Sequence, residues 1–126
     1  MKAHVLDDFI EKANLVVGEN ESLSRDYLER NPDSSVKLGM AAWGCREAAD
    51  KVIELLRAHP EVDDVDFFIK PVEELFTTVD LILKGDHGYD DFGLLCALGV
   101  RRGYHDIMTM WDVFFAGDNR SLTIIH

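Results

Sequence analysis

The fold is decided by residues 34–56, which read SSVKLGMAAWGCREAADKVIELL. Apolar residues recur in this stretch at the three- and four-residue spacing of one helix face, until His59-Pro60 ends the pattern. The first half of that face carries almost no side-chain bulk, because it consists of glycine and alanine: Gly39, Ala41, Ala42, Gly44, Ala48 and Ala49. Each glycine lowers helix propensity by about 1 kcal/mol, which a closely packed second helix would offset. We therefore predict a long helix, capped by Asp33 or Ser34, against which another helix packs closely, and we expect Gly44→Leu to destabilise the fold.

Helical spacing of apolar residues covers most of the remaining chain as well. Glycine and proline mark the ends of the predicted segments, because glycine caps helices and proline disfavours a helical residue before it. The predicted helices cover residues 5–17 up to Gly18, residues 23–28 up to Asn31-Pro32, a helix opened by Pro71 that runs to Gly85, a helix from Asp90 or Asp91 to Gly103, and a last helix from Ile107 to Gly117. The apolar residues of 92–100 surround their helix axis, so this helix is expected in the centre of the fold.

The segment Glu61 to Lys70 is compatible with two structures. Val65, Phe67 and Ile69 alternate as in a strand, whereas Val62, Val65, Phe68 and Ile69 also fit one face of a helix. We interpret the segment as a short extended connection around 61–70 or a helical turn. The fold class is then all-α, a single domain over residues 1–126 built as a bundle of five or six helices.

Composition excludes several classes of function. The 126 residues contain 24 Asp and Glu against 13 Lys and Arg, a formal charge of −11 that repels nucleic acid and anionic lipid. No apolar stretch reaches the roughly 20 residues of a membrane span, and acidic residues interrupt the N-terminal apolar pattern, so we expect a cytoplasmic protein without a signal peptide. Two cysteines, Cys45 and Cys96, stand within apolar helical patterns, which favours buried thiols over a disulfide framework.

Candidate metal ligands occur in two places. Asp86, His87, Asp90 and Asp91 offer oxygen and nitrogen ligands within six residues, but they lack the calcium-loop signature, and capping of the following helix explains the aspartates without a metal. His105-Asp106 is similar to the His-Asp pair of all-helical metal-dependent phosphohydrolases, which also need a second His and a second Asp; only His87 and Asp118 are convenient. A metal-dependent hydrolase is therefore the alternative function. The common nucleophile, phosphate-loop and zinc motifs do not occur, so we favour a non-enzymatic protein without a cofactor.

An acidic run beside aromatic residues is the most suggestive surface feature. One interpretation is a solvated connection whose apolar residues point inward. The other is an interaction surface, in which carboxylates attract a basic protein and an aromatic side chain is buried against it. The residues of this predicted partner-binding site are Glu61, Asp63, Asp64, Asp66, Phe67 and Phe68. A homodimer is a further possibility, through the glycine and alanine face of the long helix or through Trp111, Phe114 and Phe115.

Two segments carry a resemblance to a known family. They are Ala41-Ala42-Trp43-Gly44-Cys45 and residues 114–122, which read FFAGDNRSL. They resemble segments of an uncharacterised helical family found in bacteria near type VI secretion genes. In that family glycines usually stand where this chain has Asp118 and Asn119, and a proline-containing turn precedes them. The resemblance implies a bacterial accessory or effector-associated protein of unknown activity, and it transfers no catalytic residue. The charge, the missing catalytic motifs and the acidic run beside aromatic residues lead us to expect a small acidic protein-binding module of immunity, adaptor or secretion-accessory type.

Overall fold

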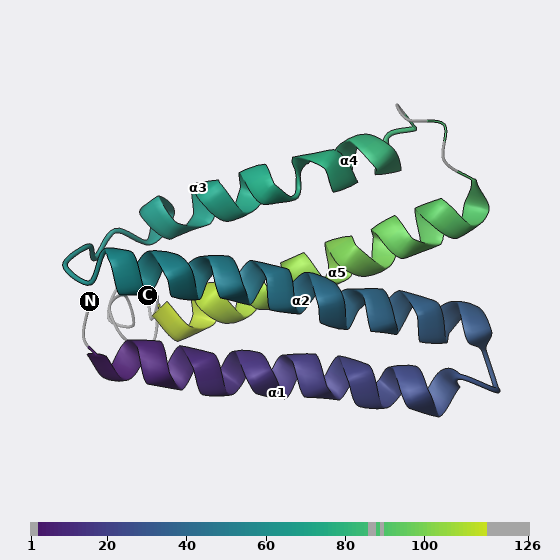
Figure 1. The fold of residues 1–126 in the computed structure, drawn as a ribbon, viewed down its shortest axis with the longest axis horizontal. Coiled ribbons are helices and arrows are strands. Elements are labelled where there is room, and N and C mark those ends of the chain that lie inside the picture. Colours follow the sequence, from purple (N-terminus) through teal and green to yellow (C-terminus); the bar gives the residue numbers. More distant parts are fainter. Residues whose placement is uncertain (1–2, 86–87, 89, 116–126) are drawn as a thin grey trace, which may run out of the picture.

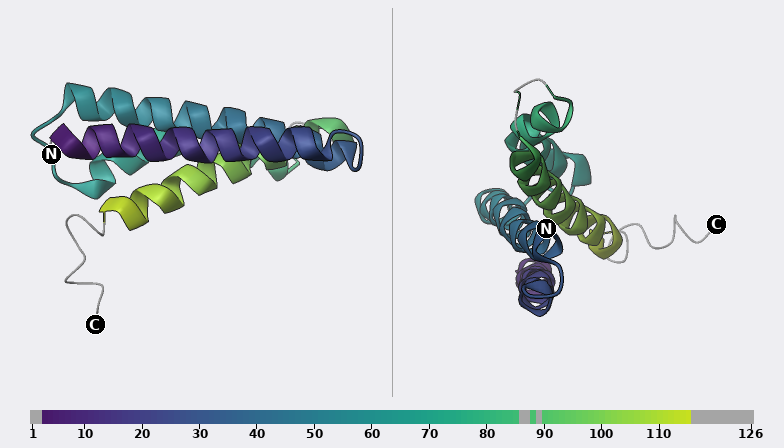
Figure 2. Two further views of the ribbon diagram at one scale, coloured as in Figure 1. Left: turned by 90° about the horizontal axis from the view of Figure 1, so that it is seen from below. Right: turned by 90° about the vertical axis from the view of Figure 1, so that its right-hand side faces the viewer.

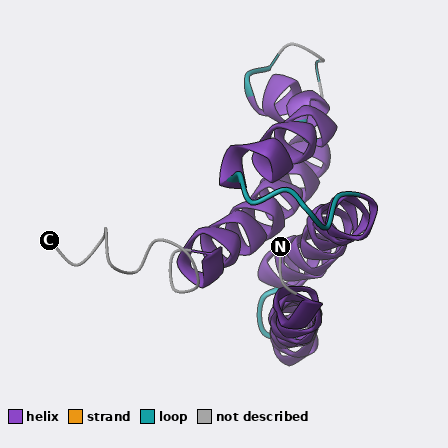
Figure 3. Cartoon of the chain, turned by 90° about the vertical axis from the view of Figure 1, so that its left-hand side faces the viewer, coloured by secondary structure: helices purple, strands orange, loops and turns teal. Residues whose placement is uncertain are grey.

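The protein is an all-α bundle, seen in a computed structural model that describes residues 3–85, 88 and 90–115 (Figure 1). Its helices in this part of the chain are α1 (Ala3–Tyr27), α2 (Pro32–Ala58), α3 (Val65–Leu75), α4 (Thr77–Leu83) and α5 (Asp91–Phe115). Helices α1 and α2 run side by side along the molecule, α3 packs against α2, and α4, which continues the direction of α3, packs against α5 (Figure 1). Helix α5 crosses the bundle obliquely, as the turned views show (Figure 2). The described elements are all helices and are joined by short loops (Figure 3).

Helix α1 is one continuous helix, which corrects the prediction of two helices separated at Gly18. Gly18 does not adopt the positive φ of a helix cap. The buried stripe instead continues past it, from Val17 to Asn20, so packing against α2 extends the helix. At the far end, the hydroxyls of Ser24 and Ser35 each donate to the other residue's carbonyl oxygen at 2.7 Å. This reciprocal pair ties the end of α1 to the start of α2.

The turn between α1 and α2 contains the cap of the long helix. The side chain of Asn31 accepts a hydrogen bond from the backbone N–H of Ser34 at 3.2 Å, and Pro32 occupies the first turn, where its missing N–H costs nothing. The predicted caps, Asp33 and Ser34, are therefore wrong by two or three residues. The long helix itself is confirmed and ends at Ala58, just before His59-Pro60.

The connection after α2 is shorter than the predicted range 61–70, because helix α3 already begins at Val65. Asp64 caps this helix by accepting from the N–H of Asp66 at 3.1 Å. Pro71 lies inside α3 and not at a helix start, and the break between α3 and α4 follows at Phe76. The spacing of Phe68, Val72 and Phe76, all buried, explains the helix: one side chain per turn enters the core.

Helices α2 and α5 pack backbone against backbone. A Cβ atom added to Gly44 would lie 2.5 Å from the carbonyl oxygen of Val100, and one added to Gly99 or Gly103 would overlap the carbonyl oxygen of Lys37 or Ala41. The close helix packing predicted from the glycine and alanine face is thus confirmed. Because Gly103 sits at this contact, α5 continues through it to Phe115, and the prediction that Gly103 ends the helix is wrong.

The core lies around the second half of α5. Trp111 is fully buried and meets the rings of Phe9 and Phe68 edge to face, with centroids 5.4 and 5.6 Å away. The first half of α5 is not central as predicted, because Phe92 and Leu98 are 62% and 45% exposed. None of the helices in the described part of the chain combines the length and the apolar character that a membrane span needs.

Candidate functional site

The predicted partner-binding residues lie where α2 passes into α3. We use the name acidic segment for Glu61, Asp63, Asp64 and Asp66, all of which are exposed. Asp64 and Asp66 occupy the cap and first turn of α3, where negative charge is stabilised by the N–H groups of the helix end. Glu61 lies 4.0 Å from the Nδ1 atom of His59. Stabilisation of the start of α3 therefore accounts for the presence of Asp64 and Asp66, and all four carboxylates of the acidic segment lie on the surface.

Phe67 is the aromatic residue that accompanies the acidic segment on the surface. Its side chain is 38% exposed, and its ring makes edge contacts with His59 and Phe68 at centroid distances of 5.0 and 5.1 Å. Phe68 is fully buried against Trp111 and belongs to the core, so it is not a surface anchor. Of the two predicted anchors, Phe67 therefore lies at the surface and Phe68 in the core. The ring of Phe68 packs against the ring of Phe67.

Of the predicted metal ligands before α5, the structure describes Asp90 and Asp91. The carboxylate of Asp90 accepts from the N–H of Gly93 at 2.8 Å, which is the geometry of a helix cap, and Asp91 is the first residue of α5. Asp86 and His87 lie outside the described residues. Within residues 3–85, 88 and 90–115, no three His, Cys, Asp or Glu side chains come together as metal ligands.

The pair His105-Asp106 lines a groove between α1 and α5, with a volume of about 460 Å³. The groove, called here the α1/α5 groove, is lined by Val16, Glu19, Asn20, Leu23, Arg102, His105, Asp106 and Thr109. One wall therefore carries Glu19, and the other carries Asp106 with Arg102, whose Nε lies 3.9 Å from the Asp106 carboxylate. Val16 and Leu23 of α1 contribute apolar side chains to the same lining.

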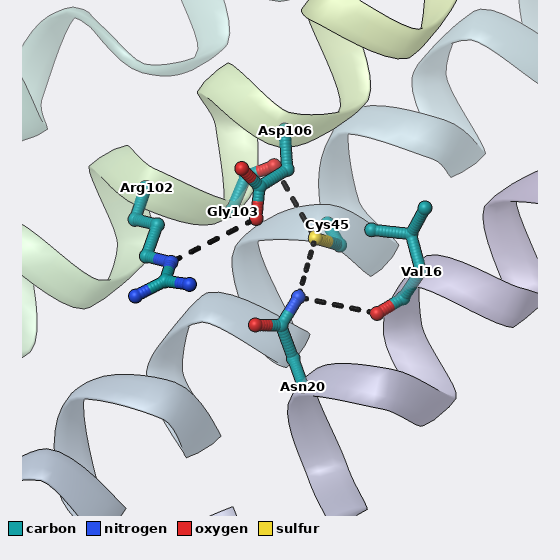
Figure 4. A network of polar contacts seen from close by, with 6 residues as sticks. All are labelled: Val16, Asn20, Cys45, Arg102, Gly103 and Asp106. Atoms are coloured by element: carbon teal, nitrogen blue, oxygen red, sulfur yellow. Dashed lines mark hydrogen bonds and ion pairs between the residues drawn. The ribbon is translucent and has the colours of Figure 1, made fainter. Parts of the chain in front are cut away.

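A polar network joins Asn20, one of the residues that line the α1/α5 groove, to the buried Cys45 (Figure 4). Asn20 donates through its amide nitrogen to the carbonyl oxygen of Val16 at 3.1 Å and to the sulfur of Cys45 at 3.6 Å. The Cys45 thiol in turn donates to the carbonyl oxygen of Gly103 at 3.3 Å. These contacts link α1, α2 and α5 at one point.

The pKa of the Cys45 thiol is raised from 9.0 to about 12, chiefly by burial and next by the nearby Asp106 carboxylate, while the Asn20 hydrogen bond and the charge of Arg102 lower it. Cys45 is therefore a protonated structural thiol at neutral pH and not an activated nucleophile. The effect of Asp106 on this pKa agrees with its position, because its carboxylate lies close to the Asn20–Cys45 contact (Figure 4).

Sequence reasoning missed Asn20, Glu19 and Leu23 as residues of a shared groove. The available signal was Asn20 itself, a polar residue three positions after Val17 on the buried stripe of α1. The pairing of this stripe with Arg102 and His105 depends on how α5 crosses α1, which the spacing of residues within either helix does not specify.

The structure bears differently on the two surfaces that the sequence predicts for a homodimer. On the glycine and alanine face of α2, Gly44 is covered by Val100 of α5, whereas Gly39 is exposed beside Ser24 of α1. Trp111 is in the core, and nothing is described of the side chains of Phe114 and Phe115. Of the two segments that carry the family resemblance, 41–45 lies in α2 and residues 116–122 of the other lie outside the described part.

Comparison of the chain with protein-family models, with curated proteins and with solved structures finds no match.

Proposed function

We propose that this protein is a non-enzymatic binding module for a basic protein partner, acting in the bacterial cytoplasm as an immunity, adaptor or secretion-accessory protein. The observation that carries the proposal is the acidic segment with Phe67 at its edge. An exposed phenylalanine held between His59 and Phe68 is already oriented before a partner arrives, so little side-chain entropy is lost on binding. Bulky aromatic residues at the centre of polar surroundings are typical of interface hot spots.

Charge supports the same function. A formal charge of −11 attracts a basic protein over a distance of about one Debye length and increases the rate of encounter. The carboxylates of Glu61, Asp63, Asp64 and Asp66 are exposed within the six residues that precede Phe67. Attraction of this kind weakens as salt concentration rises, which makes the proposal measurable.

The test is affinity capture from a lysate of the native host, at low and high salt, with three baits. The first bait is the natural protein, and the second carries Asp63→Lys, Asp64→Lys and Asp66→Lys. The matched control carries Asp7→Lys, Asp8→Lys and Glu11→Lys on the exposed side of α1, which changes the net charge equally. We expect a near-stoichiometric partner that the natural protein and the control retain at low salt and the segment variant loses.

Phe67→Ala separates the aromatic contact from the charge. Loss of the Phe67 ring should weaken capture of the partner by about tenfold or more at both salt concentrations, because hot-spot aromatic residues contribute about 2 kcal/mol or more to the binding free energy. Equal capture by the natural protein and the segment variant would refute the assignment of the site. The metal-dependent hydrolase remains the alternative, and elemental analysis of the purified protein, repeated with Asp90→Ala, distinguishes it.

A further inference from the structure

We propose that the first half of α5 is the interface of a homodimer, in which two copies of this helix pack antiparallel. The apolar residues of 92–100 surround the helix axis, a pattern typical of a helix that is enclosed on all sides. In the structure, however, Phe92 and Leu98 are 62% and 45% exposed, and Leu94 and Leu95 are only partly buried. Within the described residues, one face of this helix therefore stays uncovered.

The uncovered face contains one continuous stripe of side chains. Asp91, Leu95, Leu98 and Arg102 follow one another at steps of four, three and four residues, which places them on the same side of α5. Both charged residues are exposed, as is Leu98. Gly103, which packs against the backbone of α2, lies on a different side of the helix. We call these four residues, 91, 95, 98 and 102, the α5 stripe.

The α5 stripe is complementary to a second copy of itself. It begins with an aspartate, ends with an arginine and has two leucines between, and the charged pair shares its midpoint with the leucine pair. When two stripes lie antiparallel about a two-fold axis at this midpoint, Asp91 meets Arg102 of the second copy, and Leu95 meets Leu98 of the second copy. A parallel arrangement places like charges together. The order of the charges therefore favours an antiparallel second copy as the occupant of this face.

A hollow beside the α5 stripe can receive side chains of the second copy. The hollow has a volume of about 320 Å³ and is lined by Asp33 of α2 and by Asp91, Phe92, Leu94, Leu95 and Leu98 of α5. Its lining is apolar except for the two carboxylates. Such a lining suits an apolar side chain accompanied by a cation, which is the combination that Leu98 and Arg102 of the second copy present.

Arg102 can bind a second carboxylate while it keeps its contact within α5. Its Nε atom lies 3.9 Å from the carboxylate of Asp106, and its side chain is 48% exposed. A guanidinium carries five N–H donors, and a surface pair of this kind contributes little to stability. Donors therefore remain for Asp91 of the second copy.

The α5 stripe is a different surface from those considered above. The sequence predicts a homodimer through the small-residue face of α2 or through the aromatic residues at the end of α5, and the α5 stripe belongs to neither. The start of α5 and the acidic segment lie at opposite ends of the molecule (Figure 1). The dimer therefore does not depend on the proposed function, and failure of one proposal does not bear on the other.

The test is sedimentation velocity of the full chain over a range of concentrations. The salt concentration is about 150 mM, so that repulsion between two negative copies is screened. We expect a monomer–dimer equilibrium with a dissociation constant on the order of 10 μM, as for a small interface. A chain that stays monomeric up to about 200 μM would overturn the proposal and leave this face to a different partner.

Exchange of the charges tests the antiparallel register. Asp91→Arg and Arg102→Asp each place like charges together at both ends of the stripe, so each variant alone should dimerise at least about thirtyfold more weakly. An equimolar mixture restores both opposite-charge contacts and should dimerise within about threefold of the natural protein. Recovery on mixing shows that both variants are folded. A mixture that stays monomeric, or variants that dimerise alone as the natural protein does, would contradict this register.

Leu98→Glu tests the apolar part of the α5 stripe. Two-fold symmetry places this substitution in the interface twice, so dimerisation should weaken by at least about thirtyfold. Leu15→Glu is the matched control, because Leu15 is 67% exposed on α1 and the substitution adds the same charge. Circular dichroism verifies the helix content of each variant. Equal dimerisation of Leu98→Glu and the natural protein, or equal weakening by the two substitutions, would refute the assignment of the interface.

Discussion

Gly103 lies where α5 touches the backbone of α2. A Cβ atom there would overlap the Ala41 carbonyl oxygen and come within 2.7 Å of the Cys45 backbone nitrogen. Neither is the flexible end of a side chain, so the two helices would have to separate. Gly18, also in a helix, has nothing within 4 Å of the same position.

This contrast gives a matched pair of substitutions. Gly103→Ala should lower the free energy of unfolding by about 3 kcal/mol, because overpacking displaces rigid backbone. Gly18→Ala should raise it by about 0.5–1 kcal/mol, because alanine has the higher helix propensity and meets no obstacle. Denaturant titration of the three proteins measures both effects. Equal stability of Gly103→Ala and the natural protein would mean that the helices are not in backbone contact.

Cys45 makes stability depend on pH in the alkaline range. The folded protein holds the thiol proton up to a pKa of about 12, whereas the unfolded chain releases it above about 9.0. Above pH 9 the unfolded state therefore binds fewer protons, and its stability relative to the folded state increases. The contribution of Cys45 is present in full below pH 9 and is lost as pH rises toward 12.

We expect the free energy of unfolding to fall by about 1.4 kcal/mol per pH unit above pH 9 through this one group. Burial also raises the pKa of Tyr104, so the natural protein is compared with Cys45→Ser, which keeps a hydroxyl donor and does not titrate. The measurement is denaturant unfolding at several pH values from about 8 to 11. Parallel pH profiles for the two proteins would contradict the buried, protonated thiol.

At the level of secondary structure, the helical conformation of α3 determines which side chains of residues 65–75 point into the core. The sequence left strand and helix open for its first part, and the buried residues Phe68, Val72 and Phe76 repeat at the period of a helix. Adjacent phenylalanines consequently have different roles. Phe68 is enclosed by Trp111 and the other core rings, and Phe67 faces the surface.

Substitution of the two phenylalanines should separate these roles. Phe68→Ala removes a fully buried ring and should cost about 3–5 kcal/mol of folding free energy. Phe67→Ala loses part of a surface contact and should cost about 1 kcal/mol or less. Thermal unfolding followed by circular dichroism measures both changes. A larger loss of stability for Phe67→Ala than for Phe68→Ala would mean that Phe67, and not Phe68, faces the core.

On the scale of the whole molecule, the excess of negative charge opposes the compact state. The formal charge is −11, and ion pairs among the described residues, such as Arg46–Glu21 and Arg101–Asp80, lie at the surface, where each contributes little. Repulsion among the remaining carboxylates should therefore dominate the response to salt.

We expect the melting temperature to rise as sodium chloride increases from about 10 to 200 mM, because screening weakens repulsion at distances near the Debye length. The variant with Asp7→Lys, Asp8→Lys and Glu11→Lys, which carries less net charge, should gain less. Differential scanning calorimetry measures both proteins. A melting temperature that falls with salt would show that attractive surface pairs outweigh the repulsion.

Local properties such as helical spacing, helix propensity and charge were enough to predict the fold class, the long helix α2, its small-residue face and the acidic segment. They did not predict that α1 continues through Gly18 and α5 through Gly103, that Phe68 is buried, or that Asn20 and Asp106 line one groove. Whether a glycine ends its helix or allows a second helix to pack closely against it depends on what lies opposite the glycine. That neighbour comes from a distant part of the chain, so local patterns do not contain it.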